Sequence, residues 1–170
     1  MRQFKYLFCG FLILFIPYSC QKDDENNTAS KTVVINELMA VNSITAADQD
    51  GEYDDWIELF NITGNEIDLS GYYLTDSKNN LTKWKFPEGT SIAGFEYLIV
   101  WADKDTTQAG LHTNYKLSSL GERVILLSPE VEILDKVEYD AQTKELGYAR
   151  VPNGTGNFVW QTATFGYRND

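Results

Sequence analysis

The chain has few of the side chains from which nitrogen- and sulfur-based sites are built. Its 170 residues include one histidine, His112, and two cysteines, Cys9 and Cys20. Both cysteines precede the part of the chain that has the composition of a folded domain, so that part has no disulfide framework. Zinc is not expected, because its sites need roughly three or four histidine or cysteine ligands, for which carboxylates substitute only in part.

The motifs of common catalytic sites are lacking as well. Neither a thiol nor a G-x-S-x-G motif is present to act with His112, so we expect a histidine at the surface or at a strand end, with local hydrogen bonds. Asp54 and Asp55 are neighbours on an extended segment and point to opposite faces, which is wrong for the paired carboxylates of a glycoside hydrolase. No helix follows the turn at residues 153–156, unlike in a phosphate-binding loop. We therefore expect no enzyme; a hydrolase of an unrecognised kind is the alternative.

Basic residues are outnumbered by acidic ones. The sequence holds 14 Lys and Arg against 25 Asp and Glu, a net charge of −11, and its basic residues form no patch. Proteins bind nucleic acids largely through Lys and Arg side chains that displace counterions from the phosphates. No nucleic-acid partner is therefore expected.

Helical periodicity is also absent, since nowhere do apolar residues recur at i, i+3, i+4 and i+7 over three turns. Aromatic residues make up 14% of the chain, and together with β-branched residues they gather in short runs separated by turn residues. We predict strands at residues 33–40, 56–61, 67–74, 84–86, 96–102, 123–128, 133–139, 147–151 and 158–160. Many short strands of this kind indicate an all-β sandwich or barrel, here one domain over residues 32–170.

Residues 48–74 form the stretch around which we expect the other strands to pack. The predicted strand at 56–61 and the stretch 67–74 are expected to form a hairpin around the turn at 63–65. Residues 96–102 are apolar on both faces, which suggests a central strand.

The predicted strand at 56–61 alternates between two faces. Ile57 and Leu59 point one way, and Trp56, Glu58 and Phe60 point the other. We therefore predict Ile57 and Leu59 as core residues, together with Ile35, Leu69, Leu98, Val100, Leu126 and Val137.

The first 19 residues are predicted to be a lipoprotein signal peptide. A positive start is followed by the apolar run at residues 6–18, which is shorter than the roughly 20 residues that span a bilayer. Ser19 and Cys20 then resemble the end of a bacterial lipobox, although Pro17 and Tyr18 depart from its usual pattern. We expect Cys20 to carry a lipid; an ordinary cleaved signal with a chance cysteine is the alternative.

Residues 20–31 are polar and free of aromatics, and we predict a disordered acidic tether there. Residues 21–25 resemble the acidic tag that directs lipoproteins to the cell surface in the Bacteroidetes group. The expected location is the outer membrane, with a lipid anchor and exposure at the cell surface.

An acidic loop precedes the strand at 56–61, and it is the one candidate metal site. Five carboxylates fall within eight residues: Asp48, Asp50, Glu52, Asp54 and Asp55. Oxygen clusters suit Ca²⁺, which takes about 6–8 oxygen ligands. The loop is not an EF-hand, because Tyr53 and Leu59 stand where that motif needs its Gly and its bidentate Glu. The alternative is a solvated turn with Asp50 and Gly51 at its corner.

Several separated motifs resemble the lamin tail domain family. They are Ile-Asn-Glu-Leu at residues 35–38, Asp-Trp-Ile-Glu-Leu-Phe-Asn at 55–61, and the segments 69–76, 84–87, 97–102, 112–118, 121–122 and 150–156. Together they cover about residues 33–169. The resemblance implies an immunoglobulin-like β-sandwich without catalytic residues. It also implies a binding or structural module, here with a protein or polysaccharide ligand at the cell surface.

A calcium-dependent carbohydrate-binding or adhesion module is the alternative to a plain binding or structural role. Such a module would place exposed aromatic side chains beside the acidic loop. The four candidates for a sugar-stacking surface are Trp56, Trp84, Trp101 and Trp160, and positions in the sandwich core are the better explanation for them.

Overall fold

The computed structural model describes residues 31–170. The predicted signal peptide at 1–19, the lipidation site Cys20 and the predicted tether as far as residue 30 lie outside these residues. Lys31 is described, and its Nζ lies 2.9 Å from Asp135 Oδ1. Within residues 31–170 all regular elements are β-strands, so none of them offers a helix suited to crossing a membrane.

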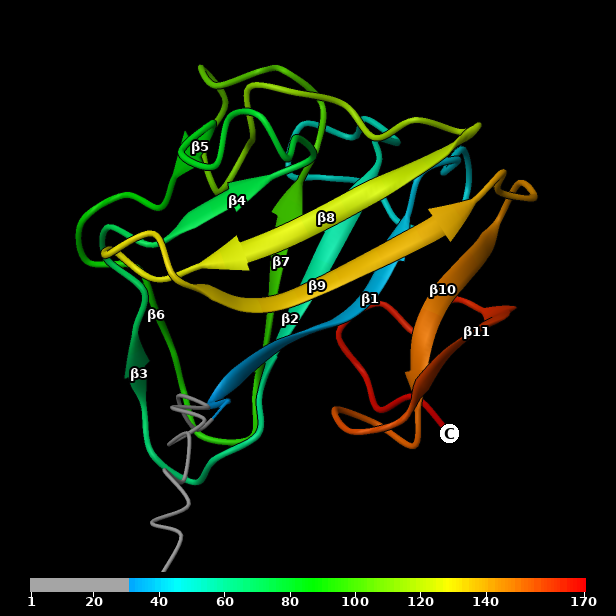
Figure 1. Ribbon diagram of the computed structural model, residues 1–170. Coiled ribbons are helices and arrows are strands. Elements are labelled where there is room, and N and C mark those ends of the chain that lie inside the picture. The colour runs from blue at the N-terminus through cyan, green and yellow to red at the C-terminus, as the bar shows by residue number, and fades with distance from the viewer. Residues whose placement is uncertain (1–30) are drawn as a thin grey trace, which may run out of the picture.

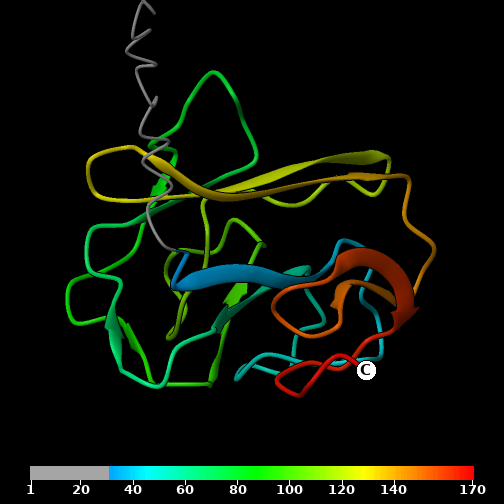
Figure 2. The ribbon, with the colours of Figure 1, turned by 60° about the horizontal axis from the view of Figure 1, so that its bottom comes forward.

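Two antiparallel sheets form the body of the domain, and they stack on one another (Figures 1 and 2). The larger sheet has the order β11-β10-β1-β2-β7 and consists of β1 (Val33–Met39), β2 (Trp56–Asn61), β7 (Tyr97–Trp101), β10 (Leu146–Val151) and β11 (Asn157–Thr162). The facing sheet has the order β5-β4-β8-β9 and consists of β4 (Tyr73–Thr75), β5 (Trp84–Lys85), β8 (Gly121–Leu127) and β9 (Ile133–Asp140). A small pair, β3 (Ile67–Asp68) with β6 (Ser91–Ile92), stands apart from both. The predicted all-β, immunoglobulin-like sandwich is confirmed.

The main core lies between the two sheets and contains the residues that alternation along the strands predicted. Ile57 and Leu59 are fully buried there. Leu98 is partly buried and packs against the same cluster, and the other predicted members belong to it: Ile35, Leu69, Val100, Leu126 and Val137.

A second apolar cluster lies on the opposite, outer face of the five-stranded sheet. Met39, Trp56 and Trp101 form it, and Phe165 covers it. The Phe165 ring meets Trp56 edge to face, with ring centroids 5.1 Å apart. Residues 163–169, called the C-terminal tail below, thus cover the side of β1, β2 and β7 that faces away from the core.

The predicted hairpin of residues 56–61 with 67–74 is wrong. β2 pairs with β1 and β7, whereas residues 67–74 divide between the small pair and the facing sheet. The side chain of Asn61 explains the departure. Its amide donates to the carbonyl oxygens of Asn65, Ile92 and Ala93 at 2.7, 3.1 and 3.0 Å. These bonds hold the turn after β2 against residues 92–93, so the chain leaves the sheet.

The interpretation of residues 96–102 as a central strand is also wrong, since β7 is an edge strand. It is apolar on both faces because Val100 enters the main core while Trp101 enters the outer cluster. Residues beyond the strand cover its edge. The amide of Trp101 donates to the carbonyl of Leu111 at 2.8 Å, and Thr113 N donates to the carbonyl of Trp101 at 2.8 Å.

Candidate functional site

The predicted calcium loop lies at the end of the sandwich opposite to the start of β1. In Figure 1 the connection between β1 and β2 is at the upper end, and β1 begins at the lower end. Asn42 ties the base of this connection together. Its amide donates to the carbonyl oxygens of Ala46 and Asp54 at 2.6 and 2.8 Å, and its Oδ1 accepts from Thr45 N at 3.1 Å.

Asp48 organises the acidic loop itself. Its Oδ1 accepts hydrogen bonds from the amides of Asp50 and Glu52, both at 2.9 Å, and Gly51 supplies the positive φ of 86° that the turn needs. Its Oδ2 is buried and has no hydrogen-bond partner within residues 31–170. A buried carboxylate oxygen without a partner is costly, so this atom marks a place where a cation would stabilise the loop.

Three of the five predicted ligands come together. Side-chain oxygens of Asp48, Glu52 and Asp54 lie within 4.8 Å of one another. Gln108 adjoins them, because its Nε2 donates to Glu52 Oε2 at 3.2 Å while its Oε1 is buried without a partner in the described part of the chain. This set of oxygen atoms fits the chemistry of Ca²⁺.

Asp50 and Asp55 do not join that group. Asp50 is exposed. Asp55 lies near Glu122 and near Lys116, whose Nζ is also 3.3 Å from Asp54 Oδ1. Burial raises the pKa of Asp55 to about 7, and the nearby Lys116 opposes this rise only in part. The alternation of an extended segment therefore brings Asp54 into the oxygen cluster and excludes Asp55.

Asp103 and His112 form a second group with Asp48, again with ligand atoms within 4.8 Å of one another. His112 is buried, not at the surface, and sits beside the end of β7. Its Nδ1 lies 2.5 Å from Asp103 Oδ2, and its Nε2 lies 3.1 Å from the carbonyl oxygen of Ala109. Both ring nitrogens are thus engaged by the protein, so the group of Asp48, Glu52 and Asp54 is the better cation site. No serine or threonine hydroxyl is bonded to His112 among residues 31–170, so the described chain forms no triad around it.

A pair of buried carboxylates, which alternation alone did not indicate, lies under the C-terminal tail. Glu37 and Glu58 face each other across β1 and β2, and both are fully buried. A β-bulge at Asn36 lets two successive polar side chains of β1 lie on the outer face. Burial raises the pKa of Glu58 to about 7 and also raises the pKa of Glu37.

The tail supplies hydrogen bonds to both acids, and Asn36 of β1 donates a further one to Glu58 Oε1 at 2.8 Å. Thr164 Oγ1 donates to Glu37 Oε2 at 2.6 Å, and Gly166 N donates to Glu58 Oε2 at 2.6 Å. Gly147 of β10 has no side chain, which makes room for the carboxylate of Glu37. Because their partners are protein groups and both acids are shut from solvent, this pair fastens the tail and is not a reaction centre.

The four tryptophans divide three to one. Trp56, Trp84 and Trp101 are buried, and only Trp160 reaches the surface, with 36% of it exposed. Trp160 lies on β11, at the sheet edge opposite to β7, whereas the acidic loop adjoins the end of β7 through the bond from Ala102 N to the Asp55 carbonyl at 2.7 Å. No tryptophan is therefore exposed beside the loop among the described residues, and the exposed aromatic side chain there is Tyr53, which is 48% exposed.

Two stacked antiparallel sheets without a catalytic arrangement in the described residues define an immunoglobulin-like module. A comparison with protein families agrees: the family model described as Lamin Tail Domain matches residues 26–141, more than half of the chain. The chain therefore belongs to the lamin tail domain family, which is non-enzymatic in general. No curated protein matches it. The matched segment ends just after β9, so β10, β11 and the tail complete the fold beyond it.

Proposed function

We propose that this protein is a non-catalytic binding module, held at the outer face of the outer membrane by a lipid on Cys20. The observation that carries the proposal is the polarity of the domain. β1 starts at one end of the sandwich, and the connection that bears the acidic loop lies at the other end (Figure 1). A tether that leads into β1 would therefore turn the loop end away from the membrane. Its partner would be a protein or polysaccharide of the cell surface.

Loss of the anchor cysteine is expected to release the protein. Cys20→Ser should give an unprocessed or soluble chain, because Cys20 is the one cysteine that remains after removal of the predicted signal peptide at residues 1–19. Fractionation of cells, followed by detection of the protein in membrane and soluble fractions, measures this. Retention of the variant in the outer membrane at the wild-type level would contradict the anchor.

The acidic tag has a separate test in the same cells. Deletion of residues 22–25 should leave the lipid in place and reduce digestion of the protein by a protease added to intact cells. Equal digestion with and without these residues would exclude the tag as a surface signal while leaving the lipid anchor intact.

A calcium-dependent form of the same function is the second candidate. It is favoured by the grouping of carboxylate oxygens of Asp48, Glu52 and Asp54 within 4.8 Å of one another, and by the buried Asp48 Oδ2, which has no hydrogen-bond partner within residues 31–170. Three carboxylates this close repel one another, and each close pair costs up to about 1 kcal/mol in water. Lys116, whose Nζ is 3.3 Å from Asp54 Oδ1, offsets part of this repulsion. A bound Ca²⁺ would remove that repulsion and order the loop at the exposed end of the module.

Millimolar Ca²⁺ is expected to raise the melting temperature. At a hundredfold excess over Kd the native state gains about 2.7 kcal/mol, or about 5–10 °C for a chain of this size. Chelator should reverse the rise, and Mg²⁺ should produce a much smaller one, since a flexible loop meets the octahedral geometry of Mg²⁺ poorly.

Glu52→Gln combined with Asp54→Asn should abolish the response to Ca²⁺. Asp50→Asn is the matched control, because Asp50 lies outside the cluster, and it should respond as the wild type does. If calorimetry detects no heat of binding at millimolar Ca²⁺, the loop is a solvated turn and not a calcium site.

A further inference from the structure

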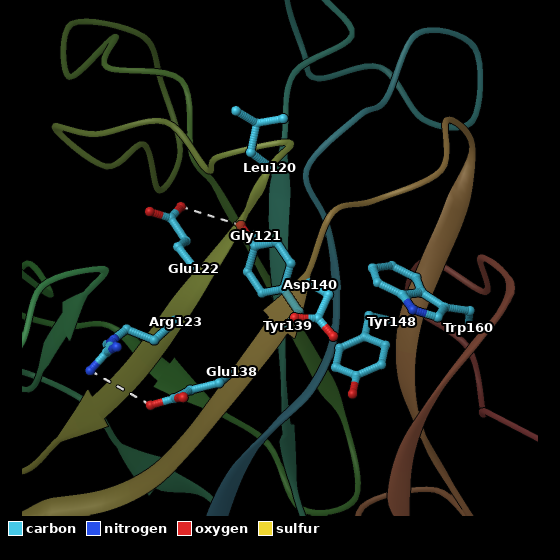
Figure 3. A pocket seen from close by; sticks show the side chains of 9 residues that line it. All are labelled: Leu120, Gly121, Glu122, Arg123, Glu138, Tyr139, Asp140, Tyr148 and Trp160. Atoms are coloured by element: carbon cyan, nitrogen blue, oxygen red, sulfur yellow. Dashed lines mark hydrogen bonds and ion pairs between the residues drawn. The ribbon is translucent and has the colours of Figure 1, made fainter.

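A surface groove of about 510 Å³ lies where the end of the β8–β9 hairpin meets β10 and β11 (Figure 3). Arg123, Glu138 and Asp140 come from the hairpin, Tyr148 from β10 and Trp160 from β11. The exposed side chain of Leu120 stands at its upper end in Figure 3. The groove is separate from the acidic loop and from the buried carboxylates.

The groove exists because the two sheets differ in width. β10 and β11 extend to the side of the facing sheet, whose edge strand is β9 (Figures 1 and 2). Tyr148 is in register with Leu38, a member of the main core, and Trp160 is in register with Tyr148. Both rings therefore point toward the side of the sheet that is core elsewhere, yet Trp160 remains exposed.

The exposed ring of Trp160 and the partly buried ring of Tyr148 belong to an aromatic row. Trp160 and Tyr148 have ring centroids 4.5 Å apart, and Tyr148 and Phe158 have centroids 5.2 Å apart. At the Phe158 end the row already holds a cation, because the guanidinium carbon of Arg150 lies 4.4 Å from the centroid of the Phe158 ring. The same guanidinium is paired with a carboxylate of β9, Asp135 Oδ2, at 2.9 Å. At this end the Arg150 guanidinium is therefore held by both an aromatic ring and a carboxylate.

At the Trp160 end an aromatic ring and a carboxylate, that of Asp140, are present, but no cation lies on the ring within residues 31–170. Asp140, the last residue of β9, lies between the rings and the Arg123–Glu138 pair (Figure 3). Arg123 Nη1 is 3.6 Å from Glu138 Oε1, so that guanidinium is engaged elsewhere. The Asp140 side chain has no ion pair or hydrogen bond within residues 31–170. Carboxylates also outnumber cations around the groove, which favours a positively charged ligand.

We propose that this groove binds a basic segment of a partner protein, with a lysine or arginine side chain lying on the Trp160 and Tyr148 rings beside Asp140. Cations are attracted to the faces of aromatic rings, and a neighbouring carboxylate adds its charge to this attraction. The proposal names the ligand class for the binding module proposed above and rests on that function. A second copy of this chain is disfavoured as the occupant because each copy carries a net charge of −11.

The test is a fluorescence anisotropy titration of labelled octalysine with the purified full chain, kept in a zwitterionic detergent that has no sugar headgroup. Binding should be seen at low salt, and oligoglutamate should not bind. Trp160→Ala should weaken binding about tenfold, Trp160→Phe should keep most of it, and Asp140→Asn should weaken it several-fold. Unchanged thermal midpoints for the variants would show that they remain folded.

Two matched controls separate the groove from general attraction to an acidic protein. Glu88→Gln removes one exposed negative charge elsewhere, and Tyr167→Ala removes an exposed ring outside the groove. Neither should change the affinity by as much as twofold. Equal losses in Asp140→Asn and Glu88→Gln, or in Trp160→Ala and Tyr167→Ala, would overturn the proposal.

Other occupants give different results. Binding of maltohexaose or cellohexaose that depends on Trp160, with none of octalysine, would make the groove a sugar site and overturn the peptide proposal. A change of oligomeric state in Trp160→Ala, measured by sedimentation without peptide, would identify a second copy instead. The cell-surface location is tested separately by protease digestion of intact cells, so the two proposals fail independently.

Discussion

Leu59→Ala is expected to lower the free energy of unfolding by about 2–5 kcal/mol. Leu59 is fully buried on the core face of β2, in register with Ile35 of β1 and Leu98 of β7. Removal of its branched end leaves a cavity between two sheets that are fixed by backbone hydrogen bonds and cannot close in on it. Denaturant titration measures the loss as a lower midpoint at an unchanged slope.

Leu120→Ala is the matched control for this substitution. The same atoms are removed, but Leu120 is 83% exposed, so the free energy of unfolding should change by no more than about 0.5 kcal/mol. If Leu59→Ala costs less than about 1 kcal/mol, the core face of β2 has been assigned wrongly.

The second large effect is a gain of stability on mild acidification. Burial raises the pKa of Glu58 from its ordinary 4.5 to about 7 and raises the pKa of Glu37 as well. Between these values the native state holds a proton that the unfolded chain has lost. The free energy of unfolding should therefore rise as pH falls from about 8 to about 5, with about 3 kcal/mol as the upper contribution of Glu58.

Denaturant titrations at several pH values test this expectation. Glu58→Gln should reduce the pH dependence without removing it, because burial also raises the pKa of Asp55 to about 7 and raises the pKa of Glu37. Glu88→Gln, at an exposed site, should leave the pH dependence as it is. The series should stop near pH 5, because hydrogen bonds lower the pKa of three other acids, Asp68, Asp105 and Glu145. Protonation of these acids at lower pH destabilises the native state. A free energy that stays constant or falls between pH 8 and 5 would show that the two buried glutamates are neutralised in some other way.

The strands and the main core could be predicted from the sequence because both depend on local alternation. Ile57 and Leu59 are separated by one residue on a strand with one face toward the partner sheet, and a period of two is enough to place them. Strand pairing is not local in this sense. The failure of the predicted hairpin came from Asn61, whose side-chain bonds to residues 92 and 93 depend on a part of the chain about 30 residues away.

The candidate sites were harder to predict, for the same reason. Asp48, Glu52 and Asp54 are near in sequence and could be grouped, whereas Gln108 and Asp103 join them only through the fold. In the sequence, Glu37 and Glu58 are charged residues on strands with one face toward the core, and such residues usually face solvent. Nothing local in their strands indicates that the tail covers them.

The C-terminal tail, which covers the outer face of the five-stranded sheet, affects when the domain can finish folding. Residues 164–166 donate to Glu37 and Glu58, and Phe165 lies over Trp56. These residues leave the ribosome after every strand of the sandwich. Until they are made, Glu37 lacks the Thr164 donor, Glu58 has its bond from Asn36 but not the one from Gly166, and the Trp56 indole is open to water, which makes an early fold unfavourable. Residues 164–166 therefore have to be made before the outer face of this sheet can take its final form.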